Sequence, residues 1–214
     1  MKSIFFLLIS FISFGQNNQQ CSSIKAISDQ EFNKKPNFTG AVKECHESGI
    51  LYKLTNYVNG KKQGEYFVYH RNGQLEYKGS YFNDLKTGEW LFYYKDGKLF
   101  SKGTYLNDEK TGEWIEYNKI GNLISKGKYI KDIKEGEWSH YYTSGKLYRS
   151  GNYLNDEETG SWIYYYENGV VKEKGVYVNG QRNGDWIFYS ETGTLLENVI
   201  YVDGVIPGPQ QGQN

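Results

Sequence analysis

A step of 24 residues recurs along this sequence and limits its fold more than any other feature. One glycine column lies at Gly40, Gly64, Gly88, Gly112, Gly136, Gly160, Gly184 and Gly208. A second glycine column, starting at Gly49, and a tyrosine column, starting at Tyr57, keep the same step. Self-similarity at a fixed period of this length is typical of a stacked repeat array. We therefore expect seven units without insertion over residues 40–207.

Each unit reads as two strands. Residues 89–94 and 98–105 are rich in aromatic side chains, and Asp96-Gly97 lies between them. Such dipeptides favour tight hairpin turns because they tolerate positive φ. The stretch 83–88 is too short for a crossover, so successive hairpins should pair antiparallel. The predicted fold class is all-β: a single elongated antiparallel β-meander built from seven 24-residue β-hairpin repeats.

The predicted turn also predicts a register. If Arg71 pairs with Gln74, Tyr66 lies opposite Gly79, and one period later Trp90 lies opposite Gly103. An aromatic ring lying across a bare strand position compensates for the missing side chain of a strand glycine. The predicted structural residues are Trp90, Trp114, Trp138, Trp162, Trp186, Gly79, Gly103, Gly127, Gly151 and Gly175. The last unit departs from this pattern, because Trp186 falls opposite Val199.

The same register sorts side chains onto two faces. Trp90, Phe92 and Leu99 are expected on a core face, and Glu89 and Lys102 on the other. A tyrosine recurs once per unit on this second face, and we take the row as a candidate binding surface because tyrosine combines an apolar ring with a polar tip. Its members are Tyr69, Tyr93, Tyr117, Tyr141, Tyr165 and Tyr189. The alternative is that the row packs against itself and its aliphatic neighbours.

The sequence offers no constellation for catalysis, for a metal or for a cofactor. Its three histidines are scattered, and the glutamates of the Glu89 column stand about 10 Å apart, two strand spacings, in equivalent environments. The Asn-Asp segments, such as Asn83-Asp84, could offer oxygens to calcium but are also what turns require. We therefore expect no enzyme activity. Lys+Arg and Asp+Glu are both 25, so the basic face that nucleic acid needs is missing.

The N-terminal residues are typical of a secretory signal. Lys2 precedes an apolar run, Ile4 to Phe14, and small residues stand before a cut after Gly15; a buried strand or an uncleaved anchor is the alternative. The expected organisation is a signal peptide (1–15), an N-terminal segment or cap (16–39), the repeat array (40–207) and a C-terminal tail (208–214). The expected location is outside the cytoplasm: periplasmic, at the cell envelope or secreted.

The chain has two cysteines, Cys21 and Cys45. In an exported protein such a pair can form a disulfide. Here the bond would tie the N-terminal segment to the start of the array. Two unpaired thiols are the alternative.

The stretches GEWLFYYKDGKL, GEWIEYNKIGNL and GSWIYYYENGVV resemble the MORN-repeat variant of many bacterial proteins, over about residues 40–207. The resemblance implies a hairpin-repeat fold. Bacterial members are often labelled antitoxin-like, and eukaryotic arrays serve as scaffolds linked to membranes. We expect an exported, non-enzymatic scaffold that binds a protein, or an extended glycan, along its aromatic sheet surface. Alternatives are an antitoxin-like neutraliser of a specific toxin or effector, and a peripheral membrane-associated repeat protein, although the chain lacks a basic amphipathic helix.

Overall fold

A computed structural model describes residues 37–208 and shows one open sheet of 14 antiparallel strands. The strands follow one another in chain order, each hydrogen-bonded to the next. Their bounds are β1 Gly40–Cys45, β2 Leu51–Val58, β3 Lys61–Tyr69, β4 Leu75–Phe82, β5 Leu85–Tyr93, β6 Leu99–Leu106, β7 Glu109–Tyr117, β8 Leu123–Ile130, β9 Ile133–Tyr141, β10 Leu147–Leu154, β11 Glu157–Tyr165, β12 Val171–Val178, β13 Gln181–Tyr189 and β14 Leu195–Tyr201. The predicted all-β meander is confirmed.

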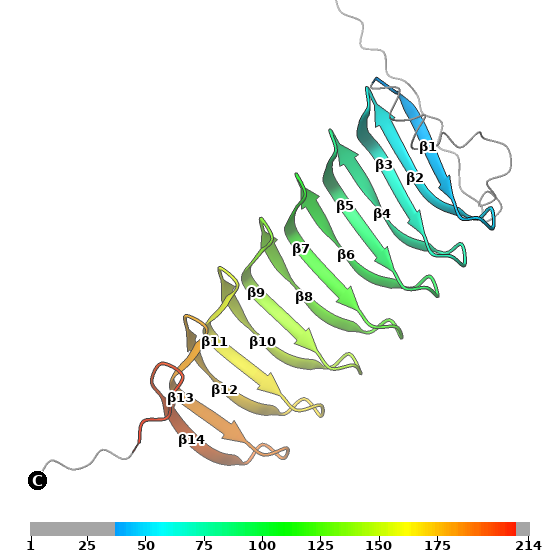
Figure 1. Cartoon of the computed structure of the whole chain (residues 1–214). Coiled ribbons are helices and arrows are strands. Elements are labelled where there is room, and N and C mark those ends of the chain that lie inside the picture. The colour runs from blue at the N-terminus through cyan, green and yellow to red at the C-terminus, as the bar shows by residue number, and fades with distance from the viewer. Residues whose placement is uncertain (1–36, 209–214) are drawn as a thin grey trace, which may run out of the picture.

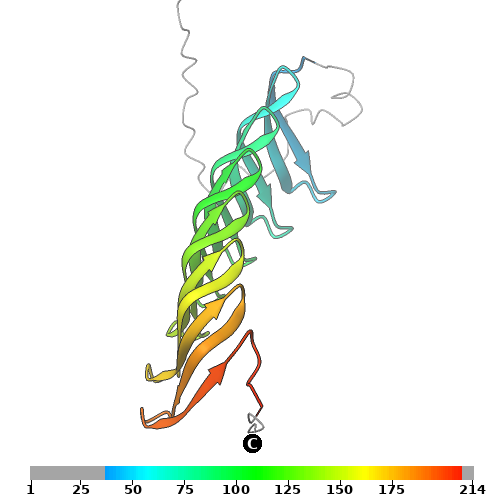
Figure 2. The ribbon, with the colours of Figure 1, turned by 90° about the vertical axis from the view of Figure 1, so that its left-hand side faces the viewer.

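The sheet is long, narrow and one layer thick. Figure 1 shows the hairpins side by side along one axis, and Figure 2 shows that their strands are curved rather than flat. Because each strand contacts mainly its neighbours in the chain, with ring contacts to the next strand but one such as Phe92–Trp114, the core is distributed along the array. No helix in the described part of the chain could cross a membrane.

Two kinds of turn alternate along the sheet. Between β4 and β5, Asn83 and Asp84 both have positive φ, 50° and 72°, as a two-residue type I′ turn requires. The Asp84 carboxylate accepts the backbone N–H of Lys62 at 2.8 Å, and this contact recurs one and two units later. The interpretation of the Asn-Asp segments as turns is confirmed.

The turn between β3 and β4 is longer than predicted. The pairing of Arg71 with Gln74 is wrong, because the backbone N–H of His70 donates to the carbonyl of Gln74 at 2.8 Å and leaves three residues in the turn. A bulge in the strands that follow absorbs the extra residue, so Tyr66 still lies opposite Gly79. The predicted register is confirmed in the body of the hairpins, at Trp90–Gly103, Trp114–Gly127, Trp138–Gly151, Trp162–Gly175 and Trp186–Val199.

Each indole, however, lies over a glycine of the preceding hairpin. A Cβ built on Gly103 would lie 2.1 Å from the ring of Trp114, and one built on Gly79 would lie 2.2 Å from the ring of Trp90. The remaining pairs are Trp138 over Gly127, Trp162 over Gly151 and Trp186 over Gly175. The prediction that Trp90 covers Gly103 is therefore wrong. The contact joins successive hairpins, not the two strands of one hairpin.

A bulge at each junction between hairpins explains the shift. Between β4 and β5 the register moves so that the three residues 88–90 face the single residue Gly79. Gly88 has φ of 68°, and nothing lies within 4 Å of a Cβ built there. Glycine is therefore required at 88 by the backbone conformation, but at 79 by the space that the indole occupies.

The two faces of the sheet are unlike. The tryptophan face carries the five tryptophans and a tyrosine column that includes Tyr105, and the tyrosine face carries the predicted tyrosine row. Leu99, expected beside Trp90, lies opposite Tyr93 on the tyrosine face. The reason is the bulge next to the longer turn, which reverses the alternation of side chains at the start of β6.

The indole contact gives a stability prediction. Gly103→Ala should lower the free energy of unfolding by about 1–3 kcal/mol, because the new methyl group meets the Trp114 ring. In a Trp114→Leu background most of this loss should disappear, whereas in a Trp90→Leu background it should remain. Urea unfolding of the single and double variants measures the coupling. Equal coupling to both tryptophans would contradict the assignment.

Candidate binding surfaces

The tryptophan face is closed although no second layer covers it. Trp90, Trp162 and Trp186 have no exposed surface. The ring of Trp90 meets those of Tyr81 and Tyr105 edge-on, at centroid distances of 5.4 and 5.7 Å. A cation completes the cover in most units. The cations over the indole rings are Lys86 at 5.0 Å, Lys110 at 4.5 Å, Lys134 at 4.9 Å and Arg182 at 3.9 Å.

The indole N–H groups are also satisfied on this face. Trp114 Nε1 donates to the carbonyl of Thr104 at 3.2 Å, and Trp138, Trp162 and Trp186 bond the corresponding carbonyls. Trp90 Nε1 is the exception and has no partner among the described residues. The indoles of the tryptophan face therefore present little that a ligand could contact.

One unit replaces the covering lysine. Glu158 stands in the lysine column, and the cation over Trp162 is instead Arg149, 4.9 Å from the ring and 2.5 Å from a Glu158 oxygen. In the next hairpin the same two positions carry Glu173 and Arg182, paired at 3.0 Å. The pair is thus reversed in orientation while a cation still covers the indole.

His140 belongs to this face too. Its ring stacks on that of Trp138 at 6.0 Å, and its Nε2 has no partner among the described residues. Burial, together with the charges of Arg149 and Lys134, lowers the pKa of His140 to about 4. The imidazole is therefore neutral at physiological pH and acts as an aromatic filler.

The other two histidines lie near the N-terminal end of the sheet. His46 and His70 line a hollow of about 640 Å³, in which His70 Nδ1 stands 3.7 Å from Glu76. Among residues 37–208 no group of three or more His, Cys, Asp or Glu side chains could hold a metal ion.

The tyrosine row lies where the sequence places it, one ring per hairpin at the ends of the odd-numbered strands. All six tyrosines are half-buried. Each lies opposite an aliphatic residue of the neighbouring strand: Leu75, Leu99, Leu123, Leu147, Val171 and Leu195. Burial raises the pKa of Tyr69 and of Tyr93. The row therefore offers half-buried aromatic rings with hydroxyls along an open face.

A second line of side chains runs beside the tyrosine row. Directly opposed residues cross the whole tyrosine face, and we call this line the central row. Its members, from β1 to β14, are Lys43, Leu54, Phe67, Lys78, Leu91, Lys102, Ile115, Lys126, Ser139, Ser150, Ile163, Lys174, Ile187 and Asn198. Sequence reasoning missed the central row because it requires the register at both kinds of turn.

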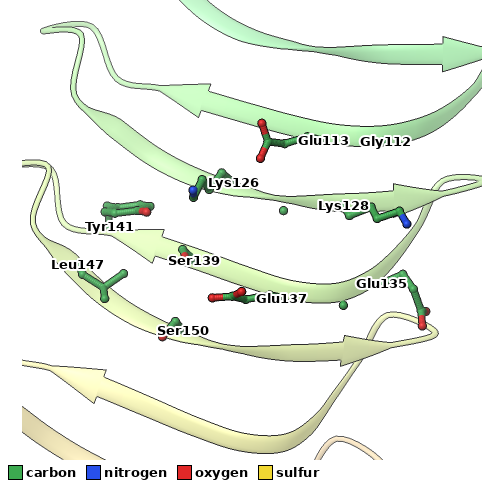
Figure 3. Close-up of a pocket in the computed structure, with 12 residues that line it drawn as sticks. Gly112, Glu113, Lys126, Lys128, Glu135, Glu137, Ser139, Tyr141, Leu147 and Ser150 are labelled. Atoms are coloured by element: carbon green, nitrogen blue, oxygen red, sulfur yellow. The ribbon is translucent and has the colours of Figure 1, made fainter.

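A hollow of about 650 Å³ opens on the tyrosine face between β7 and β10 (Figure 3). Tyr141 and Leu147 lie at one end of it, and Glu135 and Lys128 at the other. The side chains between them are Glu113, Lys126, Glu137, Ser139 and Ser150. The lining mixes carboxylates, amines, hydroxyls and one aromatic ring.

The predicted disulfide falls partly outside the described residues. Cys45, at the end of β1, is disulfide-bonded. Cys21 is the other cysteine of the sequence and lies, with the predicted signal peptide, in the part of the chain that is not described.

The single sheet of stacked hairpins, with one closed and one open face, defines an open-ended β-hairpin repeat protein. The MORN repeat variant family matches residues 62–83, 86–107, 134–155, 158–179 and 182–203, and the chain belongs to this family. Residues 110–131 are not matched, although they form the same strands. No curated protein matches the sequence significantly.

Segments of larger solved structures match this chain, with TM-scores too low to indicate a shared function. The GtfA/B complex bound to UDP and GlcNAc gives a TM-score of 0.23 at 13% identity, over 53% of this chain and 22% of that chain. TarM gives 0.21 at 16% identity, over 78% and 24%. TcdB2-TccC3-TEV gives 0.22 at 11% identity, over 81% and 12%. This chain thus spans at most a quarter of these solved chains.

The reversed ion pairs give a testable charge swap. Arg149→Glu alone places two carboxylates together and should lower the free energy of unfolding by about 1–3 kcal/mol. The double variant Arg149→Glu/Glu158→Arg should recover most of this loss, because it recreates the arrangement of Glu173 and Arg182. Thermal and urea unfolding measure the recovery. If the double variant lost as much free energy of unfolding as the two single variants lose together, the equivalence of the two ion pairs would be contradicted.

His140 gives a pH prediction. Its pKa is near 4 in the folded chain and 6.5 in the unfolded chain, so between these values the unfolded chain binds more protons. The stabilisation that the neutral His140 ring gives the fold is therefore fully present above pH 6.5 and is lost as the pH falls toward 4. The variant His140→Phe copies Phe92 and Phe188. Its free energy of unfolding relative to that of the natural chain should be higher at pH 5 than at pH 7.5 by on the order of 1 kcal/mol. Urea midpoints at both values test this, and an unchanged pH dependence would contradict it.

Proposed function

We propose that this chain is an exported, non-enzymatic repeat scaffold that binds an extended protein partner along its tyrosine face. The observation that carries the proposal is the contrast between the faces. The tryptophans are covered by rings and cations, whereas the six tyrosines stand half-buried in line on the open side. From β3 to β13 the row extends over roughly 50 Å at one strand per 4.8 Å.

The chemistry of the tyrosine face suits a protein partner. The tyrosine row lies beside the central row, where apolar side chains alternate with lysines, and a glutamate column lies beyond it. Aromatic rings flanked by mixed polar groups are typical of protein contact surfaces. Repetition also argues against catalysis, because a catalytic acid and base must have different environments. Glu89 and Glu113 occupy equivalent environments.

Export rests on the N-terminal residues. Lys2 and the apolar run from Ile4 to Phe14 have the composition of a secretory signal, and eleven residues are too few to span a bilayer, which needs about 20. We infer that the mature scaffold works outside the cytoplasm.

The direct test is capture from an envelope fraction with the mature chain, followed by identification of the retained protein. A variant with Tyr93→Ser, Tyr117→Ser and Tyr141→Ser should lose most of the captured partner, because these are the central members of the row. A control with Phe100→Ser and Ile120→Ser removes exposed apolar side chains away from the row and should retain it. Equal capture by both variants would contradict the proposal, and competition by soluble polysaccharides would favour a glycan.

A further inference from the structure

The central row is regular except at one hairpin. From β3 to β13 an apolar residue stands on each odd-numbered strand and a lysine on each even-numbered strand, but β9 and β10 carry Ser139 and Ser150 instead. The two serines lie directly opposite one another. Lys126 precedes them in the central row and Ile163 follows them. The row therefore has a gap about 10 Å wide, two strand spacings, in which one apolar side chain and one lysine are missing.

The gap coincides with the hollow of Figure 3. Both serines line it, with Tyr141 and Leu147 at one end. Ser139 is only 9% exposed, and its hydroxyl makes no hydrogen bond with any described residue although it lines the hollow. The Ser139 oxygen is not one of the buried polar atoms that lack a partner, so it is open to the hollow and can donate or accept a hydrogen bond there. The floor of the hollow is thus polar and available to a ligand.

The missing lysine also leaves a carboxylate without its usual neighbour. In the two preceding hairpins Glu89 lies diagonal to Lys102, and Glu113 to Lys126. At the position diagonal to Glu137 stands Ser150. None of Glu89, Glu113 and Glu137 forms an ion pair among residues 37–208, so the hairpins differ in the nearby lysine and not in a bonded pair. The charged residues that line the hollow are three glutamates and two lysines, so its net charge is 2 − 3 = −1. One additional cation would neutralise it.

We propose that this gap receives one long basic side chain of the protein partner, an arginine or a lysine. Its aliphatic stem would lie where the apolar side chain of the central row is missing, beside Tyr141 and Leu147. Its cationic head would stand beside Glu137, where the other hairpins place a lysine, within reach of the serine hydroxyls. Arginine fits best, because its fork of donors can serve a carboxylate and a hydroxyl together. This inference rests on the proposed function and names the anchor by which the partner is recognised.

The test uses a fluorescein-labelled strand peptide of alternating threonine and valine with one central arginine. Fluorescence anisotropy with the full mature chain should show saturable binding, and replacement of the arginine by citrulline, which keeps the shape without the charge, should weaken it about tenfold or more. Glu137→Gln should weaken the arginine peptide similarly. Saturable binding that citrulline or Glu137→Gln leaves unchanged, or no binding up to millimolar peptide, overturns the proposal.

Two further variants test the gap itself. Ser139→Ile/Ser150→Lys completes the central row with the residues of neighbouring hairpins, so it should fold with an unchanged or higher Tm and bind no arginine peptide. Leu91→Ser/Lys102→Ser opens a matching gap beside Glu89 and should raise the stoichiometry from one peptide to two. If the completed row binds the peptide as the natural chain does, the proposal fails.

The outcome is separable from that of the proposed function. A captured partner that the completed row retains, but that the triple tyrosine variant loses, would leave the scaffold proposal standing and overturn the anchor. A neutral hexose that saturates the gap while the arginine peptide does not bind would also overturn it. Loss of the captured partner on completing the row supports both.

Discussion

The sheet depends on one contact, the indole that lies over a bare glycine across the junction between hairpins. Within a hairpin the longer turn already aligns the two strands. Between hairpins the strands pass a bulge in which three residues face a single glycine. Because this glycine, such as Gly103, has no side chain, it leaves a space at the junction. The Trp114 ring fills this space and bonds the carbonyl of Thr104. Because most contacts join neighbouring strands, the stability of the array is close to a sum of such junctions.

The two faces of the sheet therefore differ in role: one holds the packed core and the other is open. Tryptophans, edge-on tyrosines and covering lysines or arginines hold the tryptophan face closed, so variation there, such as the reversal of Arg149–Glu158 to Glu173–Arg182, keeps the same cover. The tyrosine face has no comparable cover. Its most marked departure from the repeat, the serine pair on β9 and β10, opens a hollow and adds no buried contact of its own.

Much of the fold could be predicted from the sequence. The 24-residue step, together with turn residues such as Asp96-Gly97, predicts the antiparallel order and the register of Trp90 with Gly103. The position of the indole was not predicted, although the sequence held a signal: each of the five tryptophans has a glycine 11 residues before it, whereas a glycine 13 residues after fails at Trp186, where Val199 stands. Leu99 was placed on the wrong face because a bulge reverses side-chain alternation, and bulges leave no reliable trace in the spacing.

The sequence by itself determined that the chain is a β-hairpin array and that a tyrosine recurs on the side away from the tryptophans, because period and alternation are local properties. The tertiary structure decided which glycine each indole covers, which side chains line up in the central row, and that Ser139 and Ser150 meet in one hollow beside Glu137. These relations depend on the register across both kinds of turn. A one-residue bulge at either turn changes that register and leaves the 24-residue spacing unchanged.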